Sequence, residues 1–299
     1  MVKREGIFMN QKKIYPSYML ILPLAVFLIF FVLPSTIGYF YAFTDWNQYN
    51  TSDLQFVGLK NFAEILDNRS LMTAFVNTII FAVVKTVGVT ILGFVFALAL
   101  NRKLKTRNVL RTIYFIPAIF SALIVGLIFA ALFDYHTGVV NQALIALRLE
   151  EWTQQWLGLR IPALVTINLA EIWRSLGYAM VITLAGLQSI SSDYLEAAMV
   201  DGATGWVRFK SIILPLIMPS VNVNILFSLI YGLKMFDLVY VMTQGGPGHD
   251  TETFGTLIMN EMSQGRFAQS VAVNFVFTIL LVIVAIAYQK FSARWEDID

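Results

Sequence analysis

Residues 196–215, EAAMVDGATGWVRFKSIILP, are the most polar and small-residue-rich run in a chain that is otherwise mostly apolar. The chemistry open to the chain is narrow. It has no cysteine, which excludes disulfides, thiol nucleophiles and thiolate metal sites. Its two histidines, His136 and His249, lie far apart, so no metal site is expected. No phosphate loop of the form GxxxxGK[ST] is present, so the chain is not expected to bind ATP, to carry a cofactor or to be an enzyme.

The segment that opens this run has the pattern of a short helix. Ser191, Ser192 and Asp193 offer N-caps, and Asp193 with Glu196 has the spacing of a capping box. The spacing predicts a helix over about 194–201.

A docking face follows from the same pattern. Gly202 can adopt a positive φ and end the first helix, and a second helix is expected near Trp206. Leu195, Ala198, Met199 and Gly202 fall on one small, mildly apolar face. Such a face suits a groove on another protein. Folding of the loop against its own bundle fits the spacing equally well.

Lipid is the expected solvent for most of the chain. Of its 299 residues, 58% are hydrophobic and 13% are charged, whereas a soluble domain carries about 25% charged residues. The net charge of +2 is too small to suggest a nucleic-acid partner. A helix needs about 20 apolar residues to cross the hydrocarbon core. Six such spans are predicted, over 18–43, 72–100, 112–133, 162–186, 213–236 and 270–290.

The elements therefore predict an all-α integral membrane protein. No loop is long enough for a separate core, so residues 1–299 are expected to form a single transmembrane domain. Thirteen Lys and Arg lie on the side shared by both termini, 101–111 and 189–211, against six on the other side. Because cytoplasmic loops carry the excess of Lys and Arg, both termini and the loop at 189–211 are expected in the cytoplasm.

The run at 196–215 resembles the EAA loop of permeases of binding-protein-dependent ABC importers. That signature reads E-A-A, three residues, G, nine residues, I-x-L-P, and every position is matched, from Glu196, Ala197, Ala198 and Gly202 to the closing proline. The resemblance implies the MetI-like permease fold. It also implies that 189–211, with Asp201 beside the glycine, is a coupling loop that sits in a cleft of a cytoplasmic ATPase.

Other stretches are similar to the maltose-type permeases of sugar importers. They include RTIYFIP at 111–117, QSISSDYL at 188–195 and VMTQGGPGHDT at 241–251. The glycines of the last stretch are typical of any tight turn. The resemblance implies that Gly245, Gly246 and Pro247 border the translocation path and help a binding protein dock. The chain departs from the maltose permease itself in lacking additional N-terminal spans and a large outside domain, which leaves the sugar open.

Polar groups inside spans are costly in lipid and mark either function or helix pairing. Glu171 and Arg174, three residues apart, are expected to pair with each other, whereas the sequence names no partner for Lys85. Three asparagines are expected to form interhelical hydrogen bonds: Asn222, Asn224 and Asn274.

Three aromatic residues are the candidates for the substrate path: Trp173, Tyr178 and Tyr231. Most membrane aromatics are packing or interfacial residues. The resemblance, however, implies that Tyr178 and Tyr231 line a sugar site.

The expected function is that of a permease subunit of an ABC sugar importer in a bacterial or archaeal cytoplasmic (inner) membrane. The resemblance implies a second homologous permease, two cytoplasmic ABC ATPase subunits, an extracytoplasmic sugar-binding protein, membrane lipid and a sugar as partners. Two alternatives remain. The substrate could be a glycerol phosphate or another polar metabolite, with Lys85, Arg174 and Lys234 as candidate cations. The chain could also be an ion-coupled secondary transporter, which predicts inverted repeats and broken helices, and the sequence shows neither pattern.

Overall fold

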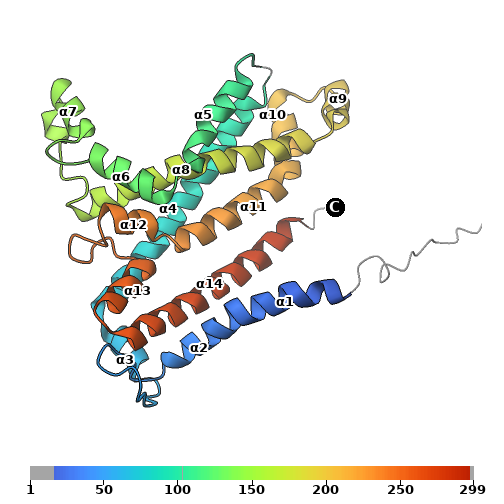
Figure 1. Cartoon of the computed structure of the whole chain (residues 1–299). Helices are drawn as coiled ribbons and strands as arrows, with labels where there is room; N and C mark the ends of the chain where they lie inside the picture. Colours follow the sequence, from blue (N-terminus) through green and yellow to red (C-terminus); the bar gives the residue numbers. More distant parts are fainter. Residues whose placement is uncertain (1–16, 103, 297–299) are drawn as a thin grey trace, which may run out of the picture.

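The computed structural model describes residues 17–102 and 104–296, and these residues form helices and loops without a β-strand. Four long helices dominate the fold (Figure 1): α4 (Arg69–Leu100), α8 (Arg160–Ser189), α11 (Leu214–Leu233) and α14 (Phe267–Glu296). A further long stretch near the N-terminus is built from η2 (Ser17–Leu20), α1 (Ile21–Phe27), the π-helical η3 (Leu28–Val32) and α2 (Leu33–Tyr41). The shorter elements are α3 (Lys60–Asp67), α5 (Arg107–Ile119), α6 (Ala122–Leu132), α7 (Val139–Ala146), η4 (Glu150–Trp152), α9 (Ser192–Val200), α10 (Gly205–Arg208), η5 (Phe209–Ile213), α12 (Asp237–Met242) and α13 (Phe254–Ser263).

The predicted spans are helical, but they differ in hydropathy and in continuity. In the described part of the chain, four helical stretches are long and apolar enough to cross a membrane: Tyr18–Tyr41, Arg69–Leu100, Gly205–Leu233 and Phe267–Ser292. The predicted span at 162–186 lies within α8, which is long enough but does not reach the same hydropathy. Its buried residues include polar and charged ones, Glu171 among them. This helix is therefore buried among its neighbours more than it is exposed to lipid.

The predicted span at 112–133 is not one continuous helix. It is divided into α5 and α6, which are bent by 96° at a short break and form either a broken span or a re-entrant loop. Phe120 and Ser121 are extended at the break, with ψ values of 141° and 148°. The Ser121 hydroxyl accepts a hydrogen bond from the amide of Ile124 at 3.3 Å and so caps α6. A serine cap between two apolar helices thus starts a new helix where hydropathy alone predicts continuation.

Small residues bring α4 close to its neighbours. A Cβ added to Gly232 of α11 would lie 2.7 Å from the Cα of Ala82, so the two helix backbones are almost in contact. A Cβ added to Gly93 of α4 would lie 2.6 Å from the Cβ of Ala179 on α8. Close approach through small residues is the usual way to pack helices in membranes. It fixes the positions of α4, α8 and α11, which together form the site described below.

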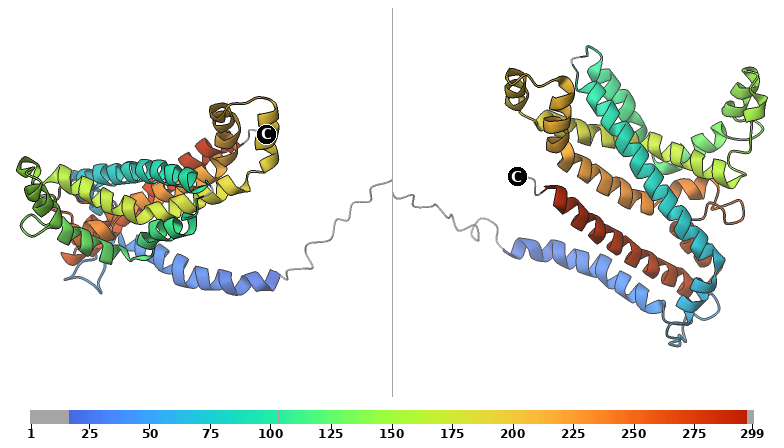
Figure 2. Two further views of the ribbon diagram at one scale, coloured as in Figure 1. Left: turned by 90° about the horizontal axis from the view of Figure 1, so that it is seen from above. Right: turned by 180° about the vertical axis from the view of Figure 1, so that it is seen from behind.

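The N-terminal helical stretch lies apart from this core (Figures 1 and 2). None of its most apolar window is buried within the described chain. It packs against α14, where the Tyr39 hydroxyl lies 2.8 Å from the Thr278 hydroxyl and the Tyr39 ring meets the edge of Phe275. The last helix of the chain therefore supports the first.

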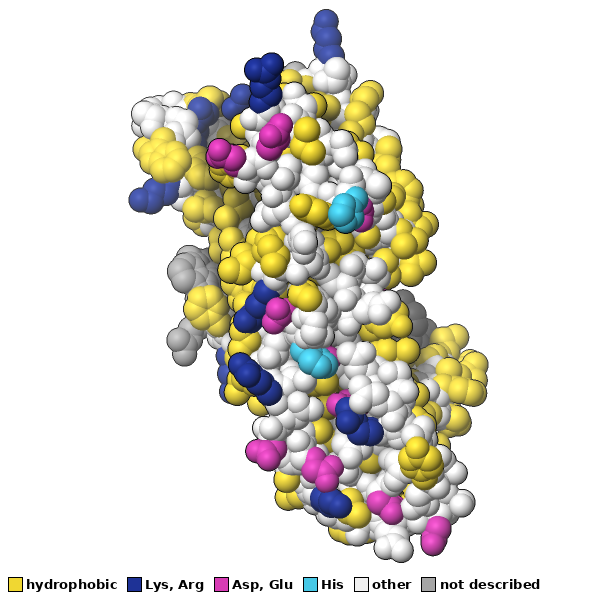
Figure 3. Space-filling view, turned by 90° about the vertical axis from the view of Figure 1, so that its left-hand side faces the viewer, with side chains coloured by type: hydrophobic (Ala, Val, Ile, Leu, Met, Phe, Trp, Pro, Cys, Tyr) yellow, Lys and Arg dark blue, Asp and Glu magenta, His cyan; other side chains and the backbone are white. Residues whose placement is uncertain are grey.

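The long helices run between two ends of the molecule (Figure 1). At one end lie α9 and α10, and at the other lie α3, α12, α13 and the arm that carries α7. Figure 3 looks onto this second end and shows charged and histidine side chains scattered among polar and hydrophobic ones.

Candidate functional site

The loop over 189–211 has the predicted local structure. The hydroxyl of Ser191 accepts the amide of Asp193 at 3.2 Å, so Ser191 is the N-cap of α9 and the predicted Asp193–Glu196 capping box does not begin the helix. Gly202 has a φ of +76°, and the amide of Ala203 donates to the carbonyl of Ala198 at 2.9 Å. These are the features of a helix that ends at a left-handed residue. The second helix, α10, begins at Gly205 with Thr204 as its cap.

The exposed face of this loop differs from the predicted one. Ala198 is buried and Leu195 half-buried, so half of the predicted face points toward the chain itself. Met199 and Gly202 are exposed. Large apolar side chains are exposed beside them, with 88% of Val200, 70% of Trp206 and 59% of Tyr194 accessible. Val200 and Tyr194 lie beyond the ends of the spans, where exposed apolar side chains are typical of an interaction surface.

The other residues predicted for the loop are accessible too. Glu196, Ala197 and Asp201 are exposed, and none of them makes an ion pair among the described residues. A Cβ built on Gly202 would meet no atom within 4 Å. The four positions therefore lie on a free surface at the tip of the molecule.

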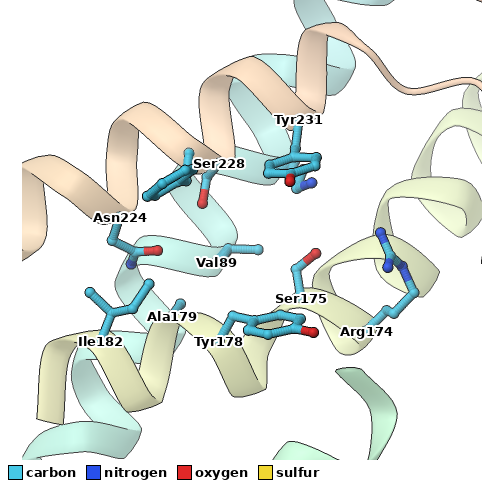
Figure 4. Close-up of a pocket in the computed structure, with 11 residues that line it drawn as sticks. Val89, Arg174, Ser175, Tyr178, Ala179, Ile182, Asn224, Ser228 and Tyr231 are labelled. Atoms are coloured by element: carbon cyan, nitrogen blue, oxygen red, sulfur yellow. The ribbon is translucent and has the colours of Figure 1, made fainter. Parts of the chain in front are cut away.

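A cavity of about 430 Å³ lies between α4, α8 and α11 (Figure 4). Its lining consists of Lys85, Val89, Arg174, Ser175, Tyr178, Ala179, Ile182, Asn224, Phe227, Ser228 and Tyr231. The size is in the usual range for a small-molecule site. Tyr178 extends from α8 and Tyr231 from α11, and their rings lie on opposite walls (Figure 4). The structure thus brings together two of the three predicted aromatic residues.

The third aromatic residue lies elsewhere. Trp173 does not line the cavity, and its ring packs against that of Phe129 on α6, with centroids 5.6 Å apart. Its place is next to the short helix that follows the break. The geometry therefore gives Trp173 a packing contact and separates it from the two tyrosines.

Three charged residues of α4 and α8, namely Lys85, Glu171 and Arg174, form one cluster. Lys85 Nζ donates to Glu171 Oε1 at 2.6 Å, across 86 residues of sequence. Arg174 donates from Nη2 to the same oxygen at 2.9 Å and from Nε to Oε2 at 3.0 Å. The predicted Glu171–Arg174 pair is present, and Lys85, for which the sequence names no partner, joins it. Lys85 Nζ also lies 5.5 Å from the centroid of the Tyr231 ring, within the range of a cation–π contact.

Two further polar residues of the cavity were not singled out by sequence reasoning. Ser175 lies one residue after Arg174 and donates its hydroxyl to Glu171 Oε1 at 2.8 Å. Ser228 lies on the same helix face as Asn224, four residues away, and that spacing is the signal that could have identified it. Asn224 is buried, but its Nδ2 has no hydrogen-bond partner among the described residues. An interhelical bond was predicted for the Asn224 side chain, and its amide nitrogen makes none among the described residues.

The glycine-rich loop lies at the end opposite α9, between α12 and α13. Gly245 has a φ of +88°, which side chains rarely adopt, and Thr251 closes the turn by donating its hydroxyl to the carbonyl of Gly246 at 2.7 Å. Asn77 of α4 anchors the loop through Nδ2, which donates to the carbonyls of Asp250 and Glu252. Gly245, Gly246 and Pro247 do not line the cavity.

The buried carboxyl group of Glu252 lies beneath the glycine-rich loop. Glu252 is fully buried, and its side chain accepts from Asn260 Nδ2 and contacts His249 Nδ1, both at 2.8 Å. Burial raises the pKa of the Glu252 carboxyl, although these two contacts oppose the increase. His249 is itself largely exposed. The pKa of the carboxyl that supports this loop therefore lies above its ordinary value.

Comparisons with known proteins point to one family. The family described as "binding-protein-dependent transport system inner membrane component" matches residues 89–297. The trehalose/maltose transport system permease protein MalF of Thermococcus litoralis is 34% identical, over 94% of this chain and 95% of that protein. The multiple sugar-binding transport system permease protein MsmF of Streptococcus mutans is 33% identical, over 93% and 94% of the two chains.

Solved structures agree on the fold. A chain of a bacterial ABC transporter that imports the acidic polysaccharide alginate superposes with a TM-score of 0.80, at 23% identity over 93% of this chain and 94% of that chain. The same score is found for that transporter in complex with its periplasmic protein, at 24% identity. The chain therefore has the fold of ABC importer permeases and belongs to the family of inner membrane components of binding-protein-dependent transport systems.

Proposed function

We propose that this chain forms half of the pore of an ABC importer and moves a sugar or oligosaccharide into the cytoplasm. The observation that carries the proposal is the loop at 189–211, in which a fully matched signature takes the form of an exposed helix–turn–helix at the tip of the bundle. Relatives over almost the whole chain are named as permeases for trehalose and maltose, for multiple sugars and for starch degradation products.

The coupling loop is the proposed contact with an ATPase. Val200 and Trp206 supply exposed apolar area, while Glu196 and Asp201 supply charge at the rim. A small helix with apolar centre and charged edges suits a cleft in a partner. Closure of the ATPase dimer would move the loop, and α8 and α11, which flank it in sequence, would carry that motion to the cavity. The chain itself breaks no covalent bond.

The cavity is the proposed substrate path. Aromatic rings bind the C–H faces of a sugar, and the polar groups between them bind its hydroxyls. Tyr178 and Tyr231 provide such rings on opposite walls, and Ser228 and Asn224 provide polar groups (Figure 4). A second homologous permease is proposed to complete the path. Gly245, Gly246 and Pro247 are proposed to receive an extracytoplasmic sugar-binding protein at the far end.

The orientation proposed for the chain places the coupling loop and both termini in the cytoplasm. Because the chain has no native cysteine, single cysteines can report their own location. Cysteine at Lys105 should react with an impermeant thiol reagent from the cytoplasmic side, and cysteine at Asp250 from the outside. Labelling of both positions from outside would contradict this orientation.

The decisive experiment is transport by purified components in sealed vesicles. The complete complex with its binding protein should accumulate sugar only when ATP is supplied. Vesicles that contain the permeases without ATPase subunits should take up no sugar under a sodium or proton gradient. Uptake under an ion gradient alone would instead favour a secondary transporter. The break between α5 and α6 is a feature that such a transporter shares, but the whole fold matches ABC importer permeases.

A further inference from the structure

The cavity has an unusual balance of charge. Among the described residues that line it, two are cations, Lys85 and Arg174, and none is an aspartate or glutamate. Glu171, the carboxylate that both cations contact, does not line the cavity. Lys85 and Glu171 are buried to a similar degree, with 3% and 4% of their side chains accessible, and Arg174 is the more accessible cation at 24%. Two positive charges and one negative charge leave a net charge of +1 in the cluster. An excess charge away from water is costly unless an opposite charge approaches it.

Glu171 already accepts several hydrogen bonds within the protein. Its two oxygens accept four hydrogen bonds, from Lys85, from Arg174 twice and from Ser175. Oε1 accepts three of these bonds and Oε2 accepts one, and Glu171 does not line the cavity. Among the described lining residues, therefore, no carboxylate is placed to accept a hydrogen bond from a ligand hydroxyl.

Unused donors remain on the cavity wall. A lysine ammonium has three N–H donors, and Lys85 gives one to Glu171. An arginine has five, and Arg174 uses two. Asn224 adds an amide nitrogen that is buried and has no partner in the described chain. In Figure 4 its side chain extends from α11 into the space between α11 and α8. This wall offers donors in excess of acceptors.

We propose that the cavity selects a saccharide that carries a carboxylate, such as a uronic acid, with its acid group near Lys85 and Arg174. A sugar hydroxyl brings a proton that needs an acceptor, whereas a carboxylate brings acceptors alone. It also neutralises the excess charge. Tyr178 and Tyr231 would hold the sugar ring itself. The inference rests on the proposed function, because it assigns a substrate class to the proposed substrate path.

Direct binding to the complete transporter in lipid nanodiscs, without the binding protein, tests this preference. The probes are a galacturonate disaccharide and a neutral galactose disaccharide of the same linkage. The acidic disaccharide should bind roughly tenfold more tightly or better, since charged hydrogen bonds are about twice as strong as neutral ones. Lys85→Met should reduce the preference to near parity, because it leaves Glu171 paired with Arg174 and removes the excess charge.

Two matched variants separate this effect from a loss of structure. The double variant Lys85→Met with Glu171→Gln restores the net +1 through Arg174, so it should recover the preference for the acidic disaccharide. Lys234→Met removes an exposed lysine that does not line the cavity, and it should bind both probes as the original chain does.

The outcomes distinguish the substrate class from the site. Equal or tighter binding of the neutral disaccharide by the original chain, lost on Tyr178→Ala, would overturn acid selection and leave the proposed path in place. Binding of neither probe, with no effect of the tyrosine variants on transport, would overturn the path as well. A preference that Lys85→Met does not change would also contradict the inference.

Discussion

Replacement of Gly202 separates the role of the coupling loop from the stability of the chain. Gly202 has a φ of +76°, and a side chain there would meet no atom within 4 Å. The cost to the isolated permease is therefore backbone strain alone, about 1–2 kcal/mol for a residue with a Cβ in the left-handed region. Asparagine adopts this region more readily than most residues, so it is the neutral counterpart of aspartate at this position. Neither variant should lower the amount of protein in the membrane.

The free-energy cost of Gly202→Asp is expected to be larger in the assembled transporter than in the isolated permease. If residue 202 enters a cleft of the ATPase, Gly202→Asp places an unpaired carboxylate there, and a buried charge without a partner costs about 3–5 kcal/mol. Docking should weaken by roughly a hundredfold or more, since 1.4 kcal/mol corresponds to a factor of ten. Gly202→Asn should be milder, because it adds similar bulk without the charge.

The assay compares sugar uptake and binding-protein-stimulated ATP hydrolysis in vesicles, normalised to the amount of permease. Both activities should fall sharply in Gly202→Asp and less in Gly202→Asn. Copurification of the ATPase on the tagged permease would report docking itself. Normal uptake by Gly202→Asp, or equal losses in both variants, would refute the charge argument.

Three other predictions follow from the cavity and the glycine-rich loop. Tyr178→Phe and Tyr231→Phe should reduce sugar uptake modestly. The alanine variants should reduce it by roughly tenfold or more, because loss of a ring contact costs about 1–3 kcal/mol. Unchanged uptake in both alanine variants would show that the two tyrosines only pack against their neighbours. Glu171→Gln strands two cations and should lower stability by about 3–5 kcal/mol, which thermal unfolding in detergent measures, and Lys85→Met added to it should restore most of the loss. Because burial raises the pKa of the Glu252 carboxyl, this group stabilises the loop at low pH. The stabilisation is lost as the pH rises from the ordinary pKa of a glutamate through the raised pKa of Glu252 in the folded loop. Amide protection factors over 244–252, which are corrected for the intrinsic pH dependence of exchange, should fall across that window, and Glu252→Gln should abolish this fall; a fall that survives this substitution would assign it to another group.

The sequence predicted the elements whose signals are local. Twenty-residue apolar runs identify α4, α11 and α14 because the hydrocarbon core sets a fixed length. The loop after α8 was predictable for the same reason, since caps and Gly202 act within a few residues of themselves. Even there, the exposed face was predicted in part only, because whether Ala198 points inward depends on how α9 meets the rest of the chain.

Long-range pairing set the limit of the prediction. Lys85 and Glu171 are 86 residues apart, and nothing in either local sequence names the other. The break between α5 and α6 was missed because the hydropathy around Ser121 suits a continuous apolar span, even though Pro117 lies four residues before it, and because the packing of α6 on α8 and α12 cannot be seen in the local sequence. Tyr178 and Tyr231 share a cavity only because Gly232 and Ala82 bring α11 against α4.

The contact between the two ends of the chain bears on how the protein is made. Tyr39 meets Thr278 across 239 residues, so the first membrane helix leaves the ribosome long before the helix that holds it. Membrane helices insert individually and associate afterwards. During synthesis, therefore, the first helix must remain in the bilayer without its partner helix. Its almost continuous apolar surface allows this, because nearly all of its side chains are compatible with lipid. Premature termination before α14 should give a chain whose central helices can associate while its first helix has no packing partner. Such a chain should be a substrate for quality-control proteases.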